Sequence, residues 1–83
     1  MIVYAECTFF IPMAASLKDK RSVLKRMTDR VKNSYNVSIA EIDHQNLWQR
    51  TTLALVATAS IKDAAEGEVR RAIRFLESNQ NGK

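Results

Sequence analysis

The sequence predicts an α+β fold in which strands and helices follow in the order βαββα. Three segments alternate in polarity and are rich in β-branched residues, and two others carry apolar residues at helical spacing. A chain of 83 residues with 46% hydrophobic and 27% charged side chains has the composition of one small globular domain. We expect this domain to span residues 1–78, followed by a polar tail over residues 79–83.

The first strand and the first helix are predicted from the N-terminal third of the chain. Residues 1–12 (MIVYAECTFFIP) alternate in polarity, and Pro12 ends the strand. Ser16 is a capping residue, and Asp19 three positions later completes a shortened capping box. Asn36, a residue that tolerates a left-handed conformation, is expected to end the helix. The buried stripe of this helix is predicted to be Leu17, Leu24, Met27, Val31 and Tyr35.

The second half of the chain predicts two more strands and a second helix. Residues 37–43 (VSIAEID) and 50–60 (RTTLALVATAS) read as strands, joined by a loop that lacks the Asn-Gly signal of a two-residue turn. Residues 63–66 (DAAE) begin the second helix. Its buried stripe is predicted to be Ala65, Val69, Ala72, Ile73 and Leu76.

These elements define a ferredoxin-like split βαβ sandwich. A right-handed crossover places the first and third strands side by side in a three-stranded antiparallel sheet. Both helices then cover one face of the sheet, and the usual final strand is missing or irregular.

Strand alternation predicts which side chains meet the helices. We expect Leu53, Leu55, Ala57 and Ala59 to do so, together with Ala40 and Ile42. The other face then holds a large apolar surface, which is typical of an interaction site. The predicted interface residues are Tyr4, Phe10, Val37, Ile39, Leu47, Trp48 and Val56. We expect a homo-oligomer, formed through this open face or through the free edge of the first strand.

The first helix carries most of the excess positive charge. Between Leu17 and Tyr35 there are seven Lys and Arg and two Asp, a local net charge of +5 in a chain of net charge +4. Such a strip indicates a polyanionic partner, although a solvated helix face that keeps a small protein soluble would look the same. The candidate nucleic-acid-binding residues are Lys18, Lys20, Arg21, Lys25, Arg26 and Lys32.

Residues 41–50 (EIDHQNLWQR) gather carboxylates, the single His and the single Trp. We expect Glu41, or Asp43, to pair with Arg50 across the hairpin and to stabilise it. No nucleophile and no recognised metal-ligand spacing accompany them, so no catalytic residue, metal or cofactor is predicted. Trp48 could stack on a base, but no second aromatic flanks it in a recognisable RNA motif, which favours a protein contact.

The single cysteine and the hydropathy predict a cytoplasmic protein. Cys7 cannot form an internal disulfide and suits a reducing compartment. No apolar run approaches the roughly 20 residues that a membrane span requires, so no membrane partner is expected.

Two blocks, SLKDKRSVLKRMTDRVKN and NVSIAEIDHQNLWQR, resemble the YlxP-like family of short bacterial proteins. The resemblance implies a ferredoxin-like fold, oligomeric assembly and a role with RNA or the ribosome, because genes of the family often lie beside genes for translation factors. It supplies no catalytic residues. We therefore expect a small, non-enzymatic oligomeric module associated with RNA or the ribosome through its basic helix. The alternative is a protein-interaction or assembly module that binds no nucleic acid.

Overall fold

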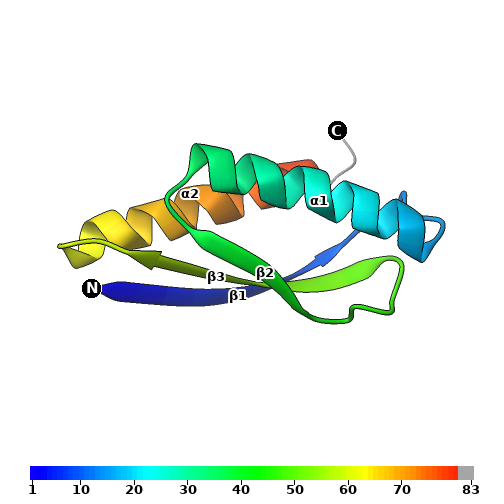
Figure 1. Cartoon of the computed structure of the whole chain (residues 1–83), viewed down its shortest axis with the longest axis horizontal. Coiled ribbons are helices and arrows are strands. Elements are labelled where there is room, and N and C mark those ends of the chain that lie inside the picture. The colour runs from blue at the N-terminus through cyan, green and yellow to red at the C-terminus, as the bar shows by residue number, and fades with distance from the viewer. Residues whose placement is uncertain (81–83) are drawn as a thin grey trace.

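The computed structural model describes residues 1–80 and contains the five predicted elements in the predicted order. In Figure 1 the strands lie beneath the helices. The elements are β1 (Ile2–Phe10), α1 (Leu17–Ser34), β2 (Ser38–Asp43), β3 (Arg50–Thr58) and α2 (Lys62–Gln80). α2 thus reaches two residues into the stretch predicted as a tail, and residues 81–83 of that tail lie outside the described part of the chain.

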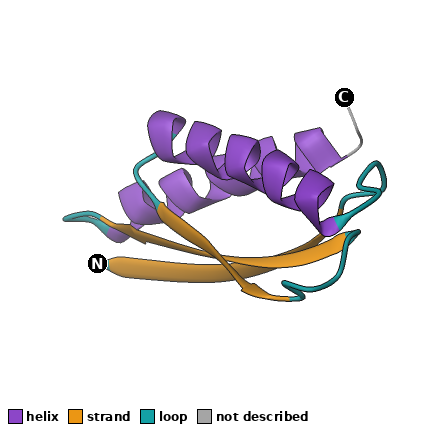
Figure 2. Cartoon of the chain, turned by 45° about the vertical axis from the view of Figure 1, so that its right-hand side comes forward, coloured by secondary structure: helices purple, strands orange, loops and turns teal. Residues whose placement is uncertain are grey.

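The sheet has the strand order β1-β3-β2, and both pairs of neighbours are antiparallel. The adjacency of β1 and β3 confirms the predicted crossover, in which α1 carries the chain past β3 to the far edge. Both helices lie on one face of the sheet, and no described segment covers the other face (Figure 2). The α+β, ferredoxin-like prediction is therefore confirmed.

α1 begins where the sequence indicated but ends before the predicted residue. The Ser16 side chain accepts a hydrogen bond from the Asp19 amide at 3.1 Å, and the Asp19 carboxylate accepts one from the Ala15 amide at 3.2 Å. These two bonds satisfy amides that a helix start leaves without partners. The helix is capped at its end by Tyr35, whose backbone is extended (φ −132°), so the prediction that Asn36 ends the helix is wrong by one residue.

The core lies between the helices and the sheet. Leu53 and Leu55 of β3 are fully buried, as are Val31 of α1 and Leu76 of α2. Burying a side chain of this size contributes about 1.5–3 kcal/mol. The central strand thus supplies the centre of the core, and the predicted inward facing of Leu53 and Leu55 is confirmed.

The predicted facing of β2 is wrong. Ile39 is buried in the core and Val37 packs against it, whereas Ala40 and Ile42 are exposed. The register explains this, because Ile39 lies opposite Leu55 and so points to the same helix-covered face. Val37 and Ile39 therefore cannot belong to an interface on the open face. A bulge between Glu41 and Asp43 then breaks the alternation near the end of the strand.

Candidate functional site

The segment from Glu41 to Arg50 connects β2 to β3 through a turn built around His44. His44 has a positive φ of 62°, a conformation that costs a non-glycine residue about 1–2 kcal/mol. Its amide donates to the Asp43 carboxylate at 2.7 Å, and its carbonyl oxygen accepts from the Leu47 amide at 3.1 Å. These bonds hold the chain in the left-handed conformation and reverse its direction.

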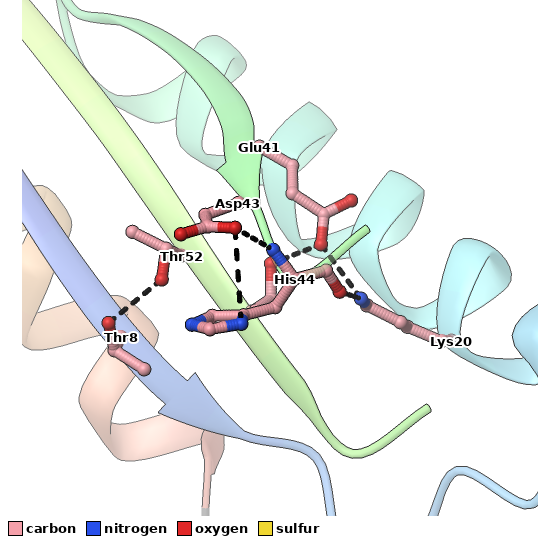
Figure 3. Close-up of polar contacts among 7 residues, drawn as sticks. Thr8, Lys20, Glu41, Asp43, His44 and Thr52 are labelled. Carbon is pink, nitrogen blue, oxygen red and sulfur yellow. Dashed lines mark hydrogen bonds and ion pairs between the residues drawn. The ribbon is translucent and has the colours of Figure 1, made fainter. Parts of the chain in front are cut away.

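A buried lysine from α1 fastens this turn (Figure 3). Lys20 is only 1% exposed, and its Nζ lies 2.8 Å from Oε2 of Glu41. The same Nζ donates to the carbonyl oxygen of His44. Thr51 donates its hydroxyl to Oε2 of Glu41 at 2.7 Å, so the buried ammonium and the partly buried carboxylate both have partners. Because a buried charge is costly unless it is paired, this network fixes the end of β2 against α1.

The predicted pairing of Glu41 or Asp43 with Arg50 is wrong. Glu41 lies on the helix-covered side of the sheet, where it meets Lys20, whereas Arg50 lies opposite Phe10 with its guanidinium 5.0 Å from the ring centre. Asp43 bonds to the His44 amide. The error follows from the misassigned facing of β2, since a shift of one residue exchanges the two faces of a strand.

Lys20 must also be removed from the candidate nucleic-acid-binding residues. Its Nζ is enclosed by Glu41 and the carbonyl oxygen of His44, so it cannot reach a phosphate. The sequence did contain the signal for this role. Lys20 precedes Leu24, Met27 and Val31 at spacings of four, three and four residues, which places it on the buried stripe.

A second set of bonds joins the loop before β3 to the connection between β1 and α1. The side-chain amide of Gln49 donates to the carbonyl oxygens of Pro12 and Ala14, both at 3.2 Å. Its backbone carbonyl oxygen accepts from the Ile11 amide at 2.9 Å. No local sequence pattern indicates such contacts, because the partners lie more than thirty residues apart. The loop is thus held at the end of the molecule where α1 begins.

The remaining interface candidates are exposed as predicted. Tyr4 and Phe10 are each 55% exposed on β1, and Val56 is 36% exposed on β3. Leu47 and Trp48 are 48% and 52% exposed on the loop. Tyr4 lies opposite Val56 in the sheet, and Ile2, 77% exposed, extends the same face towards the N-terminus. The open face therefore presents large apolar side chains to solvent.

A shallow hollow of about 430 Å³ opens at one end of this face. It is lined by Phe10, Leu47 and Trp48 together with the polar residues Asn46, Gln49 and Arg50. Phe10 and Trp48 are 38 positions apart in the chain, so the sequence did not reveal that two aromatic side chains line one depression.

The outward face of α1 keeps the other five predicted cations. Lys18, Arg21, Lys25, Arg26 and Lys32 are all exposed. Lys25 pairs with Asp29 at 3.0 Å. Within residues 1–78 no carboxylate lies within ion-pair distance of the other four. These four side chains form what we call the free basic strip: Lys18, Arg21, Arg26 and Lys32.

The titratable groups with perturbed pKa values do not form a reactive centre. Burial raises the pKa of the Cys7 thiol, with a further contribution from the charge of Glu77, and a thiol of raised pKa is a poor nucleophile. The hydrogen bond that Tyr4 donates to Glu6 raises the pKa of its phenol. Among the described residues no three His, Cys, Asp or Glu side chains lie close enough together to hold a metal ion. Neither described helix has an apolar stretch able to cross a bilayer.

Fold and surfaces together define a small ferredoxin-like α+β protein with one helix-covered sheet face and one open face. The family described as "Protein of unknown function (DUF503)" matches residues 2–83, and the chain belongs to this family. It is similar to "Uncharacterized protein YlxP" of Bacillus subtilis (strain 168), with 47% identity over 78 residues. That alignment covers 94% of this chain and 85% of the relative, which confirms the YlxP-like resemblance of the sequence.

Proposed function

We propose that this protein is a small, non-enzymatic cytoplasmic module that self-associates through its open sheet face and binds structured RNA through α1. On this proposal the natural target is RNA of the ribosome. The helix face supplies attraction to phosphates, and the assembly multiplies the number of such faces.

The free basic strip is the observation that carries the RNA assignment. Its four cations are exposed and have no carboxylate partner among residues 1–78, so they do not stabilise the fold through ion pairs. Lys18 and Arg21 also lie near the positive end of the helix dipole, where a cation is unfavourable by about 0.3–1 kcal/mol. Because the helix dipole disfavours cations at these positions, we infer that they bind an external anion. Several cations on one helix suit a phosphate backbone.

Self-association is supported by the open sheet face. Ile2, Tyr4 and Val56 form an apolar surface on the side that no described segment covers. Contiguous apolar surface of this kind is costly in water and is relieved by a second copy of the same face. β1 also lies at the edge of the sheet, where its unpaired backbone groups offer an additional contact.

A pair of matched double variants tests the RNA assignment. We expect Lys18→Gln with Arg21→Gln to weaken binding to a ribosomal RNA fragment at least tenfold at low salt, since two phosphate contacts are lost. The control, Ser60→Asp with Ala64→Glu, changes net charge equally at exposed positions near the start of α2. Equal affinities for the two variants, measured by fluorescence anisotropy of labelled RNA, would refute the assignment.

The alternative is an assembly module that binds only proteins, and the open sheet face is the observation that favours it. On this alternative the free basic strip serves solubility alone. The Lys18 and Arg21 variant would then keep its cellular partners and lose only solubility, so identification of copurified RNA or protein separates the two functions.

A further inference from the structure

We propose that the hollow beside Trp48 binds an unpaired nucleotide of the RNA: its base stacks on the aromatic side chains and its phosphate contacts Arg50. This inference rests on the proposed function and names the part of the RNA that the protein recognises. The hollow is distinct from the free basic strip, because it lies on the loop and sheet side of the molecule.

Two aromatic residues on which a base can stack line the hollow. Trp48 comes from the β2–β3 loop and Phe10 from the last position of β1, and both are about half exposed. Proteins that bind single-stranded nucleic acid stack bases on such side chains, and a second aromatic is what the sequence around Trp48 lacks. The fold supplies Phe10 from β1, where it lies opposite Arg50 of β3.

Charge distinguishes this hollow from a purely apolar contact. The Arg50 guanidinium lies 5.0 Å from the centre of the Phe10 ring, and no carboxylate of residues 1–78 pairs with it. A cation held over an aromatic ring can stack on a base and bind a phosphate at the same time. An aromatic ring joined to an anion, which a nucleotide is, complements this combination better than an apolar peptide side chain does.

The hollow is also rigid and lies close to the beginning of the basic helix. Gln49 holds its rim to Pro12 and Ala14, and Lys20 holds the preceding turn to α1. Lys18 and Arg21, in the first turns of α1, are therefore at the same end of the molecule (Figure 1). One RNA can place its unpaired base in the hollow while neighbouring phosphates contact the helix.

Trp48 is the only tryptophan, so its fluorescence reports directly on the hollow. The unmodified protein is titrated with two labelled RNAs of equal length, a hairpin with an unpaired loop and a blunt duplex. Anisotropy of the label measures binding, and Trp48 emission measures stacking. We expect both RNAs to bind and only the hairpin to quench Trp48.

Variants then separate stacking from charge. Trp48→Ala is expected to weaken hairpin binding about tenfold to a hundredfold, the range that one stacked base supplies, with little effect on the duplex. Arg50→Gln should weaken hairpin binding several-fold, again with little effect on duplex binding. Ile61→Ala, which truncates an exposed apolar side chain between β3 and α2, is the control and should change neither affinity.

Each contrary outcome has a distinct meaning. If both RNAs bind and neither quenches Trp48, the nucleotide site is refuted and the proposed function stands. If neither RNA binds at low salt, the proposed function itself fails. If Trp48 emission changes when the protein is diluted but does not change when RNA is added, a second copy of the chain occupies the hollow, which refutes the nucleotide site.

Discussion

Lys20 shows how one side chain can decide the shape of a connection. Its charged end is buried between Glu41 and the carbonyl oxygen of His44, and its stem lies on the buried stripe of α1. Lys20 thereby attaches the end of β2 and the turn at His44 to α1. A lysine that looked like part of a phosphate-binding strip is instead a structural residue.

Replacing Lys20 by Met should destabilise the fold by about 2–4 kcal/mol. Methionine keeps the packing of the stem but leaves the Glu41 carboxylate without its counter-charge, and the 21% exposure of Glu41 moderates the loss. Urea denaturation measures the change. The matched variant Lys18→Met, at an exposed position of the same helix, should stay within about 0.5 kcal/mol of the unmodified protein. Equal effects of the two substitutions would mean that the Lys20 network contributes nothing.

His44 offers a second test at the level of one residue. Its positive φ is favoured by glycine and disfavoured by β-branched residues. We expect His44→Gly to leave the free energy of unfolding unchanged or to raise it by up to about 1 kcal/mol, and His44→Val to lower it by about 1–2 kcal/mol. The opposite order in thermal unfolding would show that the imidazole, and not the backbone, stabilises the turn.

At the level of elements, the sequence predicted every helix and strand but not the facing of β2. The stripes of α1 and α2 and the alternation of β3 are long enough to define their buried faces. β2 is short, and residues 37–43 (VSIAEID) permit either Val37 with Ile39 or Ala40 with Ile42 to face inward. Only the pairing with β3 decides between them, and local sequence does not contain that pairing.

The candidate site was predictable only in part for the same reason. Exposure of Tyr4, Phe10, Val56 and Trp48 followed correctly from alternation and from the loop assignment. The burial of Lys20, the anchoring of Gln49 and the meeting of Phe10 with Trp48 all depend on contacts between segments distant in the chain. Spacing along one helix could have revealed Lys20, whereas nothing local could have revealed the hollow.

Glu68 of α2 is bonded to the connection between α1 and β2 in a way that makes stability depend on pH. It accepts a hydrogen bond from the Asn36 amide at 2.7 Å, and this bond, followed by that from Arg71, lowers the pKa of its carboxyl group. A lowered folded pKa means stability that is present above the ordinary value of 4.5 and is lost as pH falls through the folded value. We expect the difference in unfolding free energy between the unmodified protein and Glu68→Gln to be largest near neutral pH and to narrow as the pH falls below 4.5. A difference that stays constant from pH 7 to pH 3 would contradict this role.

At the level of the whole molecule, the two faces of the sheet differ in what covers them. The helix-covered face holds the core, and the open face leaves Ile2, Tyr4 and Val56 in solvent. We expect Val56→Lys to raise the dissociation constant of the proposed self-assembly at least tenfold, because a charge in the middle of an apolar contact must be buried or excluded. Sedimentation at tens of micromolar measures this.

The control for that experiment is Ala64→Lys, which adds the same charge at an exposed position of α2, away from the open face. It should sediment like the unmodified protein. Should the unmodified protein itself remain monomeric at such concentrations, the open face is not a self-association surface.

The central claim is that the free basic strip binds RNA, and the salt dependence of that binding tests it most directly. Affinity for a ribosomal RNA fragment is measured from about 50 to 200 mM salt, and its logarithm is plotted against the logarithm of the salt concentration. Four phosphate contacts predict a slope near −3 and a loss of affinity of roughly 50- to 150-fold across this range. Absence of binding at about 50 mM salt, or binding that salt does not weaken, would contradict the account.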